Sequence, residues 1–128
     1  MGNVTVRWYD DRHQTVLIDF VDHWTWDEFD AGWDEVTRLM GSTTQTVHMI
    51  LDSSRGPTPP DARVLGHFQR TWRMIPKNTG LAIVVGANAF MEGMSKVFAS
   101  AVATRLEFRT AKTMQDVDRI LTERQQEG

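Results

Sequence analysis

TVHMILDSSRGPTPPDARVLG, residues 46–66, contains the main sequence evidence for an α/β fold. Its first part, Val47 to Leu51, is an apolar run of strand length and predicts a buried β-strand. A polar loop with prolines at positions 57, 59 and 60 follows, and a helix is expected to begin near Asp61. A strand that leads through a loop into a helix N-terminus is a common way to build a binding site in α/β proteins.

The residues before this stretch predict a β-hairpin followed by a capped helix. Apolar and polar residues alternate over residues 3–8, and residues 15–21 form a second strand after a polar turn. Thr25 and Glu28 have the spacing of a capping box, and Gly41 is expected as the C-cap. Residues at spacings of three and four form one apolar stripe on this helix: Trp26, Phe29, Trp33, Val36 and Met40.

Strands and helices are expected to alternate after the opening stretch. The helix near Asp61 is expected to stop at Pro76, and the apolar run Leu81 to Val85 predicts a strand covered on both faces. A third helix begins near Asn88, where the asparagine is placed to cap it.

The C-terminal part predicts one more strand and one more helix. Leu106 to Arg109 is a short strand, and Thr113 caps a last helix whose inward side chains are Val117, Ile120 and Leu121. The tail, residues 123–128, is polar and is expected to fray. The order β-β-α-β-α-β-α-β-α predicts a single α/β domain over residues 1–128. Its five-stranded sheet should be mostly parallel, with one antiparallel strand from the first hairpin.

The bulk composition narrows the function classes. The chain has 128 residues, 41% hydrophobic and 24% charged, as expected for one globular domain. Its net charge of -3 argues against a general nucleic-acid binder, and the absence of cysteine excludes disulfides and thiolate metal sites. No apolar run reaches the roughly 18 residues of a membrane span, and the N-terminus lacks a signal region. We therefore expect a cytoplasmic protein without a cofactor and without a membrane partner.

The element order, together with the capped helix WTWDEFDAGW at residues 24–33, resembles a STAS domain. This is the fold of sulfate-transporter tails and anti-sigma-factor antagonists, and the chain is most similar to antagonist-like proteins that consist of one small domain. The resemblance implies a non-enzymatic regulatory module that acts through protein contacts.

The same resemblance raises the question of a phosphorylated serine. The family has an Asp-Ser-Ser/Thr-Gly motif at the start of its second helix, and this chain has Asp52-Ser53-Ser54-Arg55-Gly56. Here, however, the motif directly follows the strand, and Pro60-Asp61-Ala62-Arg63 occupies the position at the helix. Because Ala62 cannot accept a phosphate, we expect no phosphorylation switch. We expect Asp52 and the two serines to cap backbone amides in a turn.

A second function class is a small-molecule or anion carrier or sensor. Two helices are expected to begin at the same edge of the sheet, where their N-terminal amides attract anions. The candidate anion-binding or ligand-binding residues at that edge are Ser53, Ser54, Arg55, Gly86 and Asn88.

A third group of residues predicts a surface for a protein partner. Arg63, Arg70 and Arg73 share one face of the second helix, whereas the first helix exposes acids that include Asp27, Asp30 and Asp34. Surfaces of opposite charge favour docking of an acidic partner or self-association as a homodimer.

Catalytic and metal sites have weaker sequence support. Ser53 or Ser54 with His48 or His67 lacks the G-x-S-x-G pattern of a nucleophile elbow. Asp10-Asp11, Asp52 and Lys112 imitate the acid pair, phospho-acceptor and lysine of a receiver domain, but a strand stands where a receiver has its first helix. The four histidines have no metal-ligand spacing. We therefore expect neither an enzyme nor a metal site.

Overall fold

A five-stranded mixed sheet forms the centre of the computed structural model, which describes residues 2–55, 67, 70–71, 74–86 and 107–127. The strands are β1 (Val4–Trp8), β2 (Thr15–Val21), β3 (Val47–Arg55), β4 (Thr79–Val85) and β5 (Glu107–Ala111). Within the described residues, the helices are α1 (Trp26–Gly41) and α4 (Met114–Glu127).

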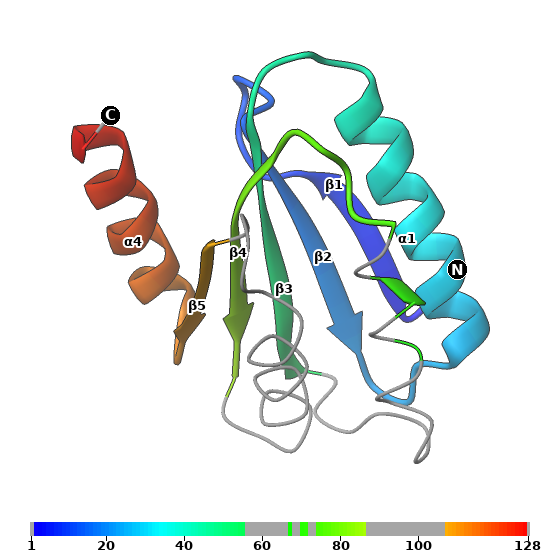
Figure 1. Cartoon of the computed structure of the whole chain (residues 1–128). Coiled ribbons are helices and arrows are strands. Elements are labelled where there is room, and N and C mark those ends of the chain that lie inside the picture. The colour runs from blue at the N-terminus through cyan, green and yellow to red at the C-terminus, as the bar shows by residue number, and fades with distance from the viewer. Residues whose placement is uncertain (1, 56–66, 68–69, 72–73, 87–106, 128) are drawn as a thin grey trace.

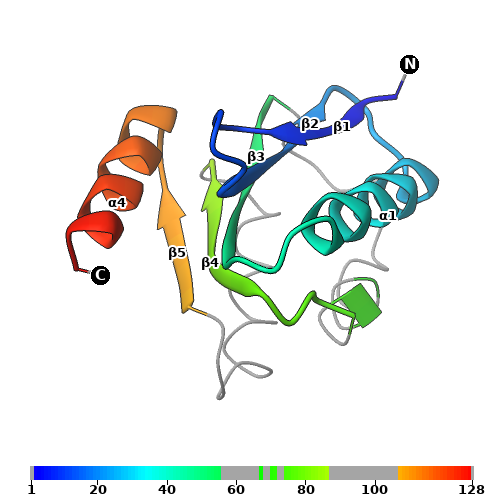
Figure 2. The same ribbon diagram turned by 90° about the horizontal axis from the view of Figure 1, so that it is seen from above.

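The strands follow one another across the sheet in chain order, β1-β2-β3-β4-β5. β1 pairs antiparallel with β2, and every later pair is parallel. The predicted hairpin and mostly parallel five-stranded sheet are therefore confirmed. α1 and α4 lie on opposite faces of the sheet (Figures 1 and 2).

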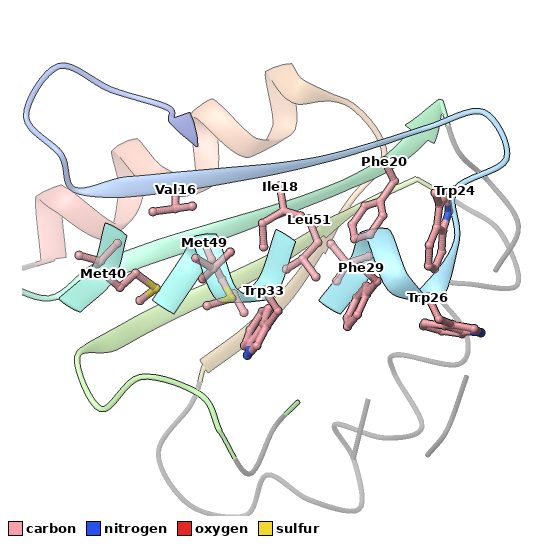
Figure 3. Packing of buried hydrophobic residues seen from close by; sticks show 14 residues of the cluster. Val16, Ile18, Phe20, Trp24, Trp26, Phe29, Trp33, Met40, Met49 and Leu51 are labelled. Carbon is pink, nitrogen blue, oxygen red and sulfur yellow. The ribbon is translucent and has the colours of Figure 1, made fainter. Parts of the chain in front are cut away.

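The capped helix α1 forms as its sequence predicts. The Glu28 N–H donates to Thr25 Oγ1 at 3.1 Å, and the Thr25 N–H donates to Glu28 Oε1 at 3.0 Å. The rings of Trp24 and Phe29 lie 6.0 Å apart, which completes a hydrophobic staple. The apolar stripe of α1 is buried against β2 and β3, as Figure 3 shows for Trp33 and Met49.

A second, smaller core lies on the other face of the sheet. Leu17 and Ile50 point to this face, and Val117 of α4 packs in the same cluster. Ile120 and Leu121 are partly buried against it, so the predicted inward face of the last helix is confirmed. The Asp116 N–H donates to Thr113 Oγ1 at 3.3 Å, which confirms the predicted cap.

Three element boundaries differ from the prediction. Gly41 remains inside α1, and Ser42 is the C-cap with φ −79°; its N–H and Oγ both donate to the Leu39 carbonyl. A side-chain cap thus replaces the expected glycine cap. β5 continues to Ala111 rather than ending at Arg109, whereas its expected first residue, Leu106, lies outside the described residues. α4 continues to Glu127, through most of the tail that we expected to fray.

The most consequential difference is the length of β3, which continues to Arg55 instead of ending at Leu51. The sheet accommodates the polar residues because neighbouring strands flank both sides: Asp52 pairs with Asp19 of β2 and with Val85 of β4. The turn expected at Asp52 to Ser54 is therefore wrong.

Some predictions lie outside the described residues. They concern the helix start near Asp61, the third helix near Asn88, and the arginines at positions 63 and 73. His67, Arg70 and Thr71 are helical, and the chain has left the helix before Pro76, as expected.

Candidate functional site

Three of the five predicted anion-site residues form the last part of β3, at the carboxyl edge of the parallel strands. We call Asp19, Asp52, Ser54 and Arg55 the edge cluster. The parallel register places Asp19 beside Asp52, and the neighbouring β4 ends at Val85 beside Asp52. Carboxyl ends of parallel strands are the usual location of ligand and partner sites in α/β folds.

Ser53 is part of the sheet interior and not of the surface. Its side chain is fully buried, and its Oγ donates to the Val85 carbonyl at 2.7 Å. This bond uses the hydroxyl to join β3 to β4. Ser53 is therefore inaccessible to a kinase or a dissolved anion while β3 and β4 remain paired.

Ser54 is exposed, but Asp52 holds it in place. The Ser54 Oγ donates to Asp52 Oδ1 at 2.6 Å, and the Ser54 N–H donates to the same oxygen at 3.0 Å. Hydrogen bonds to a carboxylate are stronger than those between neutral groups. Asp52, itself buried, thus fixes an accessible hydroxyl at the point where the register of β2 and β3 shifts by one residue.

Arg55 forms an ion pair with Asp19 on the neighbouring strand. Burial raises the pKa of the Asp19 carboxyl; the Arg55 guanidinium opposes this rise, and Asp52 adds to it. Oδ1 of Asp19 is buried and has no hydrogen-bond partner within the described residues. The Arg55 side chain is nevertheless 63% exposed, so this guanidinium remains open to a partner.

Gly86 directly follows β4 at this edge and has a backbone conformation that few other residues adopt. Its φ is 114°, and its N–H donates to the Ala111 carbonyl at 3.0 Å. The fifth predicted residue, Asn88, lies outside the described residues. An anion at this edge would therefore have to displace contacts that Ser54, Arg55 and Gly86 already make within the chain.

The predicted arginine face is partly neutralised within the chain. Arg70 Nη2 lies 3.5 Å from Asp30 Oδ1 on α1 and 3.0 Å from His67 Nδ1. The His67 ring stacks on Trp26 with centroids 4.1 Å apart. At this position the opposite charges of the two helices face each other in one molecule. The other two arginines of the face, at positions 63 and 73, lie outside the described residues.

The receiver-like acids do not assemble. Asp10 accepts N–H groups from Gln14 and Thr15 at the start of β2, and Thr15 pairs with His48. Asp52 stands four residues further along β3, about 13 Å away at roughly 3.3 Å per residue. The two aspartates therefore lie at opposite ends of the parallel strands, Asp10 at the amino end and Asp52 at the carboxyl end.

The Ser-His-Asp arrangement does not assemble either. Ser53 follows the alternation of Leu51 toward α1, whereas His48 and Ile50 point to the α4 face. Within the described residues, no group of three or more histidine, aspartate or glutamate side chains is placed to hold a metal ion.

A hollow that the sequence pattern does not predict lies at the opposite, amino-terminal edge of the parallel strands. It has a volume of about 570 Å³ and lies between the β1–β2 turn, the start of β3 and the last turns of α4. His48, which the sequence offers only as a candidate catalytic base, lines this hollow. A polar residue at the start of an apolar strand was the available signal, but its partner Leu81 is distant in sequence.

Comparisons with known proteins match the chain to no protein family, no curated protein and no solved structure. Among the helices described here, none is long and apolar enough to cross a membrane.

Proposed function

We propose that this chain is a non-enzymatic regulatory or protein-interaction module of the STAS-like kind, and that its edge cluster contacts the partner. The proposal rests on Asp19, whose Oδ1 is buried and has no hydrogen-bond partner within the described residues. A buried carboxylate oxygen without a hydrogen-bond partner, beside a second aspartate, costs stability. Costly polar arrangements of this kind concentrate at functional sites.

The two accessible groups of the edge cluster suit recognition. Asp52 fixes the Ser54 hydroxyl and Asp19 fixes the Arg55 guanidinium, so a partner would order fewer side chains when it binds. Arginine is also enriched at protein interfaces. The cluster therefore presents one hydroxyl and one cation at the end of β3, each held by an aspartate.

The two backbone donors described at this edge, the N–H groups of Ser54 and Gly86, favour recognition over catalysis. Acyl-transfer and related enzymes need free N–H groups that point at a developing oxyanion. The Ser54 N–H is bound to Asp52, and the Gly86 N–H is bound to Ala111. The same engagement disfavours the alternative of an anion carrier at this edge.

Affinity capture from the native host tests this proposal with a matched pair of charge reversals. Arg55→Glu changes the edge cluster, and Arg119→Glu changes an exposed arginine on α4 that pairs with Asp116. Both variants alter the net charge equally. We expect the wild-type chain and Arg119→Glu to enrich the same protein, and Arg55→Glu to lose it.

Circular dichroism confirms that each variant is folded, and Arg55→Gln provides a milder replacement if Arg55→Glu is not. Equal enrichment by wild-type, Arg55 and Arg119 variants would contradict the proposed surface.

A further inference from the structure

A binding site separate from the edge cluster is indicated by the hollow at the amino-terminal edge, which we call the His48 hollow. The β1–β2 turn and the C-terminal end of α4 lie at the same end of the sheet (Figure 1). The hollow's volume of about 570 Å³ is within the range of roughly 300–1,000 Å³ typical of small-molecule sites. It is therefore large enough for a compact organic ligand.

The charged side chains of the hollow favour an anion. Arg12 and Arg124 line it together with one acid, Asp10. Arg12 makes no ion pair within the described residues, whereas Arg124 pairs with Glu107. Asp10 Oδ1 already accepts the N–H groups of Gln14 and Thr15, at 2.9 and 3.1 Å. Among the described residues, Arg12 is thus the cation of this hollow that has no ion pair, and its guanidinium matches carboxylate and phosphate geometry.

His48 is held as a neutral hydrogen-bond donor. Its Nδ1 accepts the Leu81 N–H at 2.9 Å, so the ring proton is on Nε2. Burial lowers the pKa of His48, and the positive charge of Arg124 lowers it further, against smaller opposing effects of Asp10 and Glu107. The ring also packs over Gly80, where an added Cβ would lie 2.8 Å from Nδ1. These contacts fix the ring and leave the Nε2–H for a ligand.

The apolar part of the hollow comes from two elements. Leu121 of α4 and the Tyr9 ring line it, and the Tyr9 hydroxyl donates to Asp118 Oδ1 at 2.6 Å. Since this bond directs the polar end of Tyr9 toward α4, the ring offers carbon surface to the ligand.

We propose that the His48 hollow binds a small organic acid. Its acid group pairs with Arg12 and Arg124, one oxygen accepts the His48 Nε2–H, and its carbon body packs on Leu121 and Tyr9. This site is independent of the edge cluster, because it lies at the opposite edge of the sheet.

NMR titration of the ¹⁵N-labelled chain with benzoate tests the proposal. Benzamide is the neutral probe of the same shape, and inorganic phosphate is the anion without a carbon body. We expect saturable shifts of the Thr15 and His48 amide signals with millimolar benzoate, and much weaker binding of the other two probes. Absent shifts at these amides, or equal binding of benzoate and benzamide, would overturn the proposal. Phosphate binding as tight as benzoate would overturn the role of the carbon body.

Matched variants assign the roles of the side chains. Arg12→Gln should weaken benzoate about tenfold or more, because it removes a charged hydrogen bond. Arg119→Gln, on the same helix as Arg124 but outside the hollow, should leave benzoate binding unchanged. His48→Asn keeps an acceptor for the Leu81 N–H and removes the Nε2 donor, so binding should weaken by about twofold to tenfold. Equal benzoate affinity in the Arg12→Gln and Arg119→Gln variants would overturn the assignment.

Discussion

Replacing Gly80 with alanine tests how firmly the fold holds His48. An ideal Cβ at Gly80 would lie 2.7 Å from Thr46 Cγ2 and 2.8 Å from both Cε1 and Nδ1 of His48. Carbon atoms in proteins do not approach so closely, so the imidazole has to move. When it moves, Nδ1 leaves the Leu81 N–H, to which it is now bound at 2.9 Å.

The size of the effect follows from three contributions. Crowding a packed region costs about 1–3 kcal/mol, and losing one hydrogen bond costs about 0.5–1.5 kcal/mol. Restricting the unfolded chain by replacing glycine with alanine opposes these costs by about 0.4–1 kcal/mol. We therefore expect Gly80→Ala to lower the free energy of unfolding by about 0.5–4 kcal/mol.

Urea denaturation measures this change, and Gly41→Ala is the control. No atom lies within 4 Å of an added Cβ at Gly41, which is helical, so this variant should gain up to about 1 kcal/mol. NMR of the His48 ring nitrogens reports the tautomer. If Gly80→Ala is as stable as the wild-type chain and keeps the proton on Nε2, the imidazole is not held as we describe.

Four further predictions concern the core, the edge cluster and pH. Trp33→Ala should lower the free energy of unfolding by roughly 3–5 kcal/mol in urea denaturation, because the side chain is only 6% exposed; a loss under about 1 kcal/mol would refute its core role. Asp19→Asn should raise the free energy of unfolding at pH 7, because burial raises the pKa of the Asp19 carboxyl in the fold. This gain should vanish below about pH 3.8, where the Asp19 carboxyl is protonated in the unfolded chain as well. Mass spectrometry of the native protein should find no phosphate on Ser53, which is buried and bound to Val85; a phosphopeptide carrying it would contradict this. Because the pKa of His48 is lowered in the fold, the unfolded chain binds more protons in acid, and the free energy of unfolding should fall as the pH drops below about 6.5. This fall should be smaller in His48→Asn. An unchanged pH profile in that variant would show that His48 does not cause the fall.

The local signals of the sequence predicted α1 closely. Thr25 and Glu28 bond to each other within one turn, and the stripe from Trp26 to Met40 needs only helical periodicity to define a buried face. The same holds for the first hairpin, whose alternation matches the observed register. Short-range chemistry decides these elements, so the sequence alone reveals them.

The end of β3 was mispredicted because distant residues decide it. Asp52 and Ser53 are polar and favour a turn by local propensity. In the fold, Ser53 finds its acceptor on Val85, and Arg55 finds its counter-ion on Asp19. These partners are 32 and 36 residues away, and no spacing rule connects them.

The His48 hollow was missed for a similar reason. Its walls come from the β1–β2 turn, the start of β3 and the end of α4, which only the closed sheet brings together. The contact of the imidazole with Gly80 and Leu81 joins strands more than 30 residues apart. A sequence shows which of these residues are polar but not that they line one hollow.

Site-specific photocrosslinking in the native host can show whether the edge cluster contacts a protein partner, as we propose. The photoreactive residue p-benzoylphenylalanine replaces Ser54 in one variant and Arg119 in the other; both positions are exposed, but they lie on β3 and on α4. We predict one discrete crosslinked protein from position 54 and none from position 119. Crosslinking from position 119 alone, or from neither position, would show that the edge cluster is not the partner surface.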